Sequence, residues 1–452
     1  MRAILLLAAL LHLVGCSTPP VYEIAIANVS VVDVETGEIL TDRHLGISDG
    51  KIAYIGSEPT TAEHVLSGRG LWAIPGLWDM HVHISDPSFF QLFVSNGIVG
   101  VRDMGGAAPS ATDGCQSIEL DTLRSWQAEI RDGSRSGPDI VMAGQILSGT
   151  GSASALDVTT PSKARDAVRK VASSGADFVK VYEDIPLEAF EALADEAKEQ
   201  ALTIAGHVSE ETLRVVDAIR NGQRSIEHVR SNLLLCFAET DSDLEHLFES
   251  DEWDAEDQRW AARHIDSCPE VWRQFRASDT WLTPTLAVQE TLERASVAGF
   301  EHDQRRATLP ESIREAVGIR SANLRKRTPG DDADAENWNL FIHRLVSRAD
   351  RENVKMLAGS DAACEGTIPG YSLHRELELL HEAGLSNLRA LQTATLEPAK
   401  YLGREDHSGR LAVGFEADIV LLDGNPLDVI ENTRLVNTVI ADGEIVFRSN
   451  GT

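Results

Sequence analysis

Positive charge is scarce in this chain. Lys and Arg total 41 against 71 Asp and Glu, so the 452 residues carry a formal net charge of −30 at pH 7. A surface of this sign keeps a protein in solution and repels phosphate backbones, which excludes nucleic acid as an expected partner. The acidic surplus is spread along the chain, with one local concentration at residues 249–258, where we expect a solvated face.

The apolar run at the N terminus is too short to cross a membrane. Residues 1–16, MRAILLLAALLHLVGC, combine a basic residue, an apolar stretch and small residues before a cysteine, which is the layout of a secretory signal. The terminal LVGC resembles the bacterial lipobox. That resemblance implies an exported lipoprotein attached to the membrane through a lipid on Cys16, and Ser17 after the cysteine implies the periplasmic side of the outer membrane. An ordinary cleaved signal is the alternative.

Cysteine is rare, with five in the whole sequence. Apart from Cys16, an even number remains for what would be an oxidising compartment. Cys236 and Cys268 bracket one acidic segment and could pair. Four cysteines allow three connectivities, so the sequence leaves the pairing of Cys115, Cys236, Cys268 and Cys364 open.

Hydrophobic residues make up 42% of the chain, enough to fill a sizeable core, and the length allows one large domain plus a smaller one. Residues 17–74 and 408–452 contain short alternating strand patterns with turn punctuation. We therefore predict a small β-sandwich-like domain that is built from both ends of the chain.

The middle of the chain, residues 75–407, alternates strand-like apolar runs with amphipathic helical stretches. Eight such runs occur, at residues 77–83, 97–105, 139–147, 176–184, 202–208, 224–229, 280–286 and 354–362. Regular alternation of strand and helix predicts an α/β fold with a parallel sheet, and eight units close a (β/α)₈ TIM barrel. Residues 231–280 interrupt this rhythm, and we predict a helical insertion over the barrel mouth there.

Polar residues of the metal-binding kind fall at the ends of five of these strands. In such a barrel the chemistry lies at the C-terminal ends of the strands. His81 and His83 share one face of the first strand, since side chains alternate along a strand. The full set comprises His81, His83, Lys180, His207, His228 and Asp361. Imidazole and carboxylate are ligands that zinc and related ions accept, so this pattern predicts a metal site.

Lys180 has apolar neighbours in DFVKVY and would point into the confined barrel interior. A bare ammonium there would lose its hydration and its pKa would fall. We therefore expect another group to compensate the charge of Lys180. An ion pair with Glu183 or Asp184 is the ordinary structural solution.

Five short motifs together resemble the amidohydrolase superfamily, in the branch that includes imidazolonepropionase-like proteins and Xaa-Pro dipeptidases. They are PGLWDMHVH, FVKVY, AGHV, SIEHV and AGSDA, each at a predicted strand. The C-terminal GRLAVGFEADIVLLDGNPL is also similar to the family segment that rejoins the sheet domain. The likeness covers residues 22–448.

The resemblance implies a site with two divalent metal ions, zinc being the expected one. His81 and His83 would bind the more buried ion, and His207 with His228 the more exposed one. Lys180 would be N-carboxylated and bridge both ions, which resolves its burial. Asp361 would contact the buried ion and be the catalytic residue that moves protons.

The activity implied is hydrolysis of an amide, peptide or cyclic amide C–N bond through a metal-bridging hydroxide, on a small molecule such as a Xaa-Pro dipeptide or an N-acyl amino acid. Tyr182, on the same strand face as Lys180, could bind a substrate carboxylate. Arg102 could pair with the same group. Their structural alternatives are packing for Tyr182 and, for Arg102, an ion pair with Asp103 or another barrel carboxylate.

Two other functions stay open. The spacing of His207 and Glu210 in HVSE resembles the HxxE of mononuclear deaminases in the same superfamily, although Lys180 favours the two-metal hydrolase. Glu210 could instead begin a helix, where a carboxylate suits the N-terminal dipole. A surface-anchored protein that binds metal without turnover is the third possibility.

Overall fold

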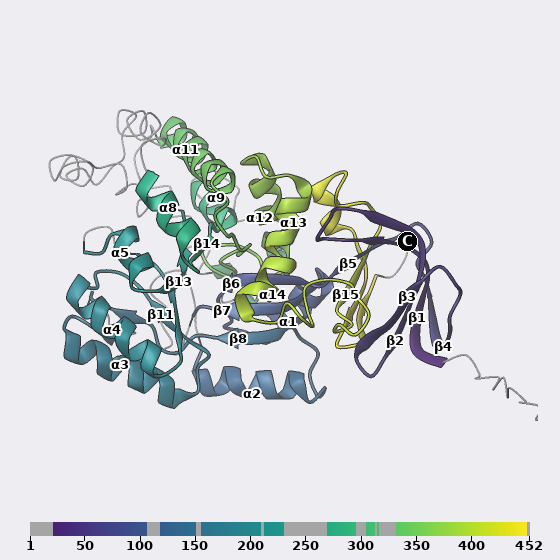
Figure 1. Ribbon diagram of the computed structural model, residues 1–452, viewed down its shortest axis with the longest axis horizontal. Helices are drawn as coiled ribbons and strands as arrows, with labels where there is room; N and C mark the ends of the chain where they lie inside the picture. Colours follow the sequence, from purple (N-terminus) through teal and green to yellow (C-terminus); the bar gives the residue numbers. More distant parts are fainter. Residues whose placement is uncertain are drawn as a thin grey trace, which may run out of the picture.

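The protein has two parts, a barrel surrounded by helices and a β sheet beside it (Figure 1). The computed structural model describes residues 21–105, 118–150, 155–208, 212–229, 269–294, 304–311, 314–315 and 331–449, without the side chains of residues 331–339. No helix among these residues is long and apolar enough to span a membrane.

The sheet beside the barrel contains strands from both ends of the chain. Its order is β17-β16-β15-β5-β1-β2-β3, with β4 paired to β1. The two ends join where β5 and β15 run antiparallel, with Ile74 opposite Val420. The strand bounds are β1 Val21–Val32, β2 Ile39–Ser48, β3 Lys51–Gly56, β4 Thr61–Ser67, β5 Trp72–Pro75, β15 Ile419–Leu422, β16 Val436–Ala441 and β17 Glu444–Arg448.

Seven regular strands of the barrel pair in parallel. They are β6 Leu77–Val82, β7 Ile98–Asp103, β8 Asp139–Met142, β11 Phe178–Val181, β12 Thr203–Gly206, β13 Gln223–Glu227 and β14 Trp281–Thr283. The short strand β9 Leu147–Ser148 pairs with β11, and β10 Leu156–Asp157 pairs with β9 on its other side.

The eighth barrel position is held by an extended segment, residues 354–362, rather than by a regular strand. Parallel bridges join its Met356 to Leu282 and its Ala362 to Val82, and a further bridge between Ala143 and Phe178 closes the gap between β8 and β11. The ring of strands is thus complete. This confirms the predicted fold class, a (β/α)₈ barrel with a β domain made from both chain ends.

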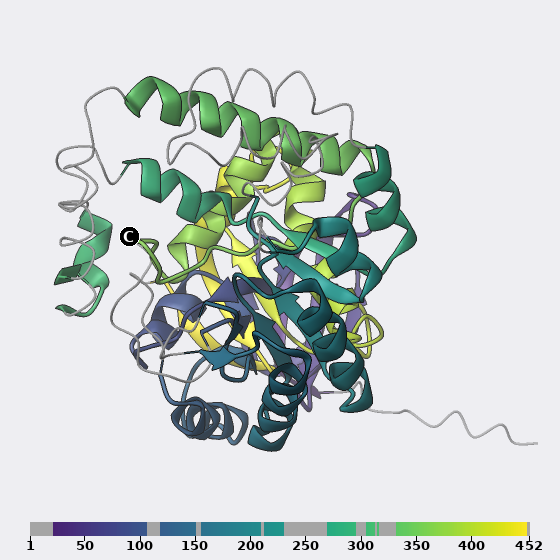
Figure 2. The same cartoon turned by 90° about the vertical axis from the view of Figure 1, so that its left-hand side faces the viewer.

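Helices pack around the outside of the strands (Figure 2). Their bounds are α1 Phe89–Ser95, α2 Leu120–Arg131, α3 Pro161–Ser174, α4 Leu187–Glu199, α5 Val215–Arg220, α8 Pro269–Ala277, α9 Leu286–Arg294, η3 Gln304–Thr308, α11 Asp331–Arg351, α12 Tyr371–Glu382, α13 Asn387–Thr393, α14 Leu396–Leu402 and η4 Ile430–Arg434.

Helix α3 illustrates how the sequence sets these elements. Thr160 caps its first turn by accepting a hydrogen bond from the Lys163 amide at 3.4 Å. Gly175 ends it in the left-handed conformation with φ of 75°. Between them Ala164, Val168 and Val171 are buried on one face, which packs the helix onto the barrel.

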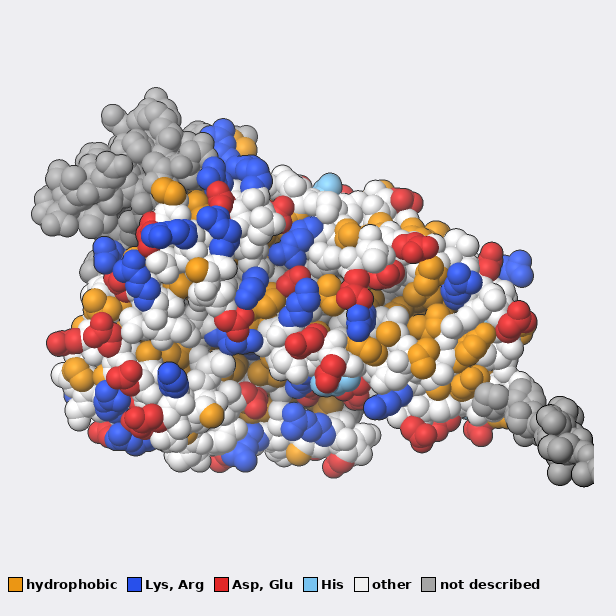
Figure 3. Space-filling view, in the orientation of Figure 1, with side chains coloured by type: hydrophobic (Ala, Val, Ile, Leu, Met, Phe, Trp, Pro, Cys, Tyr) orange, Lys and Arg blue, Asp and Glu red, His pale blue; other side chains and the backbone are white. Residues whose placement is uncertain are grey.

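Acidic and basic side chains are interspersed on the face shown in Figure 3, and hydrophobic side chains gather over the composite sheet. Of the predicted insertion at residues 231–280, the structure describes residues 269–280, which include α8. The rest of the insertion, and the acidic concentration at residues 249–258, lie outside the described residues.

Candidate metal centre

The six candidate ligands lie together at one end of the barrel. His81 is in β6 and His83 follows it, Lys180 is in β11, and His207 and His228 directly follow β12 and β13. Asp361 lies in the eighth segment. His81 and Lys180 are each 1% exposed, and His228 and Asp361 are each 6% exposed. Parallel strands bring their C-terminal ends to one edge, so residues distant in sequence meet there.

His81, His83 and Asp361 form the tightest group. Asp361 Oδ1 lies 3.3 Å from His81 Nε2 and 3.1 Å from His83 Nε2. One ligand atom from each residue fits within 4.8 Å of the others. His81 Nε2 and Asp361 Oδ1 are both buried without a hydrogen-bond partner in the described part of the chain. Two nitrogens and an oxygen that face each other in this way suit a divalent cation.

His207 and His228 form a second pair. Their Nε2 atoms are 3.0 Å apart, and their rings are nearly perpendicular at 84°. The outer nitrogens contact oxygen atoms, with His228 Nδ1 2.6 Å from Thr285 Oγ1 and His207 Nδ1 3.5 Å from Glu183 Oε1. The inner nitrogens of both rings therefore converge on one point, as two ligands of one ion do.

Lys180 is buried without a partner. Across the described ranges its ammonium has no hydrogen bond or ion pair, and the expected pair with Glu183 or Asp184 does not form. Burial lowers the pKa of Lys180 to about 8, even though the charges of Glu227 and Asp361 favour its protonated form. The described residues thus give the ammonium no direct contact, and only the nearby charges of Glu227 and Asp361 offset its own.

The segment that carries Asp361 is tied to β6. Asp79 accepts hydrogen bonds from the Ser360 hydroxyl at 2.5 Å and the Ser360 amide at 2.9 Å. The Asp361 amide donates to the His81 carbonyl at 2.8 Å. Gly359 permits this approach, since a Cβ there would lie 2.7 Å from the His81 Cβ. Asp361 is thereby fixed opposite the histidines.

Arg102, the second residue that we considered as a substrate contact, lies buried inside the barrel. Its exposed fraction is 0%, and it is engaged on several sides. It donates to Glu227 Oε1 at 2.7 Å, to Ser225 Oγ at 2.8 Å, to the Tyr401 hydroxyl at 2.9 Å and to the Met80 carbonyl at 2.6 Å. The alternative, an ion pair with a barrel carboxylate, describes Arg102.

Glu227 was missed by the sequence reasoning, although it stands in the motif SIEHV. It is 0% exposed and accepts from His81 Nδ1 at 2.8 Å. Neighbours in a strand face opposite ways, but His228 has a φ of 68°, so the chain turns at the end of β13 and both residues face the site. A carboxylate directly before a strand-end histidine was the available signal.

The charge states of this cluster agree with its hydrogen bonds. Burial lowers the pKa of His81 to about 4 despite the nearby carboxylates. Burial would raise the pKa of Glu227, but the Arg102 charge and the His81 hydrogen bond bring it below its usual value. The pKa of Asp361 is also lowered, since the histidines around it outweigh its burial. A neutral imidazole beside two carboxylates is the state that binds metal.

Tyr182 is half-buried, and its ring centroid lies 4.2 Å from that of His207. Cys364, three residues after Asp361, is disulfide-bonded. Cys115, Cys236 and Cys268 lie outside the described residues, so the pairing stays a prediction.

Gly206 provides the first testable prediction. Its φ is 142°, and a Cβ there would lie 2.0 Å from the Val181 carbonyl oxygen, a backbone atom that cannot move aside cheaply. Gly206→Ala should separate β12 from β11, displace His207, and lower the free energy of unfolding by about 4 kcal/mol. The control is Gly222→Ala. Gly222 has a φ of 84°, but a Cβ there would have no other atom within 4 Å, so the free energy of unfolding should fall by only about 1 kcal/mol. Urea unfolding and zinc titration measure both variants, and equal effects would contradict this account.

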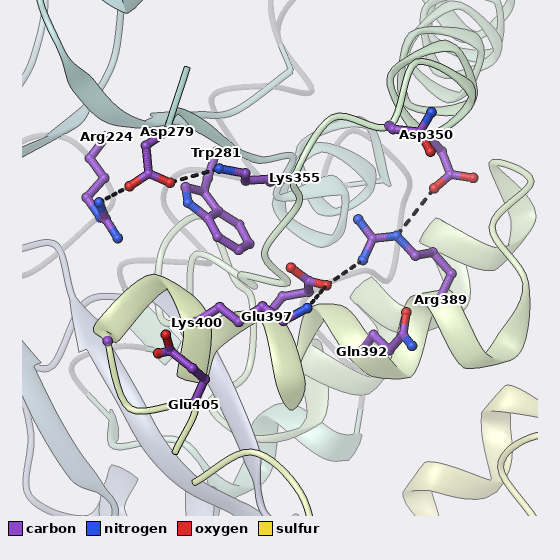
Figure 4. A pocket seen from close by; sticks show the side chains of 12 residues that line it. Arg224, Asp279, Trp281, Asp350, Lys355, Arg389, Gln392, Glu397, Lys400 and Glu405 are labelled. Carbon is purple, nitrogen blue, oxygen red and sulfur yellow. Dashed lines mark hydrogen bonds and ion pairs between the residues drawn. The ribbon is translucent and has the colours of Figure 1, made fainter. Parts of the chain in front are cut away.

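Figure 4 shows an open depression of about 990 Å³. Its lining includes Arg224, Trp281 and Lys355, which lie near the starts of β13, β14 and the eighth segment, so it opens at the end of the barrel opposite the candidate ligands. Its charges pair among themselves. Asp279 binds Arg224 and Lys355, the latter at 2.8 Å, and Glu397 lies 3.2 Å from Arg389 and 3.3 Å from Lys400. This end of such barrels generally serves stability, and the paired charges agree with that role.

Glu397→Gln tests this structural interpretation. The substitution removes one charge from the network, so we expect the free energy of unfolding to fall by up to about 1 kcal/mol. Zinc content and turnover should be unchanged, because the metal-binding candidates lie at the other end. Urea unfolding and metal analysis on the same preparation check the prediction, and a loss of zinc would contradict it.

The closed barrel of parallel strands carries histidines, a lysine and an aspartate at its C-terminal mouth, which makes it a (β/α)₈ barrel protein with a candidate metal centre. The amidohydrolase family model matches residues 72–446, most of the chain, and the chain belongs to the amidohydrolase family. The prediction of a hydrolase of this superfamily is confirmed.

Individual relatives are more distant. Ochratoxinase of Aspergillus niger is 23% identical over 471 residues, which cover 90% of this chain and 84% of that protein. Allantoinase of Enterococcus faecalis is 43% identical over 65 residues, only 14% of this chain and 13% of that protein. The crystal structure of a Xaa-Pro dipeptidase with bound methionine has a TM-score of 0.64 and 21% identity, with 94% of this chain and 100% of that chain covered. At this identity, the likeness shows the fold.

Proposed function

We propose that this protein is a binuclear metal-dependent hydrolase that cleaves an amide, peptide or cyclic amide C–N bond. The observation that carries the proposal is the pair of buried atoms, His81 Nε2 and Asp361 Oδ1, that face each other without a hydrogen-bond partner in the described part of the chain. A buried polar atom without a partner is costly. A bound cation is the partner that fits both.

In this proposal His81, His83 and Asp361 hold one ion, and His207 with His228 holds the other. Zinc is the metal we propose, because imidazole predominates among the ligands. Lys180 supplies the ligand between them once it is N-carboxylated. Its neutral amine attacks carbon dioxide, a nitrogen–carbon bond forms, and one proton leaves, so the buried cation becomes an anion. The lack of a partner for its ammonium and its lowered pKa support this step.

Bound divalent ions polarise a carbonyl group and lower the pKa of water, which makes attack on an amide feasible at neutral pH. Asp361 carries the protons. Its carboxylate stays ionised because its pKa is lowered, so it can accept a proton from the attacking water and then donate it to the leaving nitrogen. The hydrogen bond from the Asp361 amide to the His81 carbonyl fixes the carboxylate for both steps.

The substrate we propose is a Xaa-Pro dipeptide or an N-acyl amino acid. The similarity to a Xaa-Pro dipeptidase supports the first class. Both classes end in a carboxylate, which the Tyr182 hydroxyl would bind from its half-buried place beside His207. Tyr182 contacts substrate in this proposal and binds no metal.

The test is a metal analysis followed by an activity screen on the zinc-loaded full chain. Dipeptides, N-acyl amino acids and lactams are offered, and released amine is measured. We expect two ions per chain and hydrolysis in at least one class. One ion with ammonia release from a heterocycle would indicate instead the mononuclear deaminase that uses Glu210, a residue outside the described ranges. Metal without turnover would indicate a binding protein.

We also propose that the protein is an exported bacterial lipoprotein, held at the periplasmic side of the outer membrane by a lipid on Cys16. The support is the LVGC sequence at the end of the N-terminal apolar run. Palmitate labelling of the wild-type chain and of Cys16→Ser tests this directly. Equal labelling of the two, or recovery of the wild-type chain without label, would contradict it.

A further inference from the structure

Glu227 holds the imidazole of His81 from behind. It ends β13, is 0% exposed and uses both of its oxygens. Oε2 accepts a hydrogen bond from His81 Nδ1 at 2.8 Å. Oε1 accepts from Arg102 at 2.7 Å and from the Ser225 hydroxyl. A carboxylate so enclosed has no route to substrate, so its effect must pass through His81.

Arg102 in turn holds Glu227. Its guanidinium is 0% exposed and reaches four elements besides its own strand. It donates to the Met80 carbonyl of β6 at 2.6 Å, Ser225 of β13 at 2.8 Å, Thr283 of β14 at 3.4 Å and the Tyr401 hydroxyl of α14 at 2.9 Å. A planar guanidinium that is hydrogen-bonded on so many sides cannot rotate. The carboxylate that pairs with it is fixed in both charge and orientation.

We propose that Glu227, clamped by Arg102, is a positioning residue that sets the tautomer and orientation of His81 for metal binding. The metal part rests on the function proposed above. A carboxylate paired with a guanidinium only accepts hydrogen bonds, so the shared proton lies on His81 Nδ1. The lone pair then lies on Nε2, the buried atom that faces Asp361 at 3.3 Å. Such outer partners raise metal affinity by holding the ligand ready.

Two other candidate histidines have described Nδ1 contacts of a different kind. His207 Nδ1 lies 3.5 Å from Glu183, whose side chain is 47% exposed, and His228 Nδ1 contacts the hydroxyl of Thr285, which can donate or accept. His81 thus has the contact that specifies a single tautomer. It is the ligand on which we expect preorganisation to depend most.

Glu227→Gln is the informative variant. If the amide oxygen faces Arg102, its NH₂ group faces His81 Nδ1, and the imidazole must accept there. Its proton then moves to Nε2 and blocks the metal-facing nitrogen. We expect zinc affinity to fall by about 10 to 100-fold, the range for outer-shell partners.

The matched control is Glu196→Gln. Glu196 is also a buried carboxylate, 1% exposed, in a two-point contact with Arg169 at 2.7 and 3.0 Å. It lies on α4, away from the candidate ligands. Both variants lose a buried carboxylate that pairs with an arginine, although Arg169 is 53% exposed and Arg102 is not, so thermal stability without metal can fall in both. Only Glu227→Gln should change zinc affinity and the absorption spectrum of the cobalt-substituted full chain.

A second variant removes one support without disturbing the ion pair. Tyr401→Phe deletes the hydroxyl that Arg102 contacts at 2.9 Å. It should weaken zinc binding in the same direction as Glu227→Gln and by less. This variant keeps the test available if Glu227→Gln does not fold.

The tautomer itself can be measured without metal. Long-range proton–nitrogen spectra of histidine-labelled full chain, with the His81 signals identified by their loss in His81→Asn, should place the ring proton on Nδ1 in the wild-type chain and on Nε2 in Glu227→Gln. A wild-type proton on Nε2, or unchanged zinc affinity and cobalt spectrum in a folded Glu227→Gln, would overturn the proposal. Since neither readout uses turnover, a wild-type chain that fails to hydrolyse any substrate refutes only the proposed function.

Discussion

Replacement of Lys180 by methionine should remove activity while leaving a better-packed barrel. The proposed N-carboxylated side chain bridges the two ions, so its loss should lower turnover by more than about 100-fold, beyond the effect of an outer-shell partner. Without metal, the free energy of unfolding of the variant should be higher by at least about 1 kcal/mol. The reason is that an apolar side chain of similar size replaces a buried ammonium without a described partner. Metal analysis, kinetics with bicarbonate present and urea unfolding measure these quantities.

The control for this substitution is Lys163→Met. Lys163 is half exposed and pairs with Asp157 at 2.6 Å on the barrel exterior. It should keep two ions per chain and normal turnover. If Lys180→Met retained both ions and activity, the bridge would be refuted. If both variants lost metal equally, the effect would belong to lost positive charge and not to position 180.

Asp361→Asn should separate proton transfer from metal binding. The amide keeps the shape of the side chain and one oxygen ligand, but cannot accept a proton from water. We expect turnover to fall by about 10² to 10⁴-fold, the range for general acid–base catalysis, while zinc content falls much less. Kinetics and metal content are measured on the same preparation.

His83→Asn is the comparison for Asp361→Asn. His83 Nε2 lies 3.1 Å from Asp361 Oδ1, and in the proposed function His83 is only a ligand. Its loss should reduce turnover and metal content in parallel. Parallel losses in Asp361→Asn as well would reduce Asp361 to a ligand and leave the proton transfer unassigned.

Much of the architecture could be predicted because periodicity reports it directly. Alternation of strand and helix over residues 75–407 predicted the barrel, and two-residue alternation placed His81 and His83 on one face. The eighth segment is less regular than its pattern suggested, since it joins its neighbours through the isolated bridges at Met356 and Ala362. The geometry of the turn that carries Asp361, with a φ of 56°, has no signature in the sequence pattern.

The support of the site was harder to predict. Arg102 and Glu227 are 125 residues apart in the chain and meet only because the barrel closes. Sequence alone could say that a buried arginine needs a carboxylate, but several carboxylates at strand ends were available. The carboxylate that pairs with Arg102 is determined by the stagger between the barrel strands. That stagger cannot be predicted from a single sequence.

The seam between β5 and β15 has a consequence for the newly made chain. Val420 pairs with Ile74, so β5, whose other edge pairs with β1, meets its second partner only after residues 419–422 have been synthesised. Until then the hydrogen-bonding edge of β5 stays open to other chains. Pairings this distant in sequence form late and slowly, so we expect assembly of the composite sheet to be the step most sensitive to aggregation during refolding.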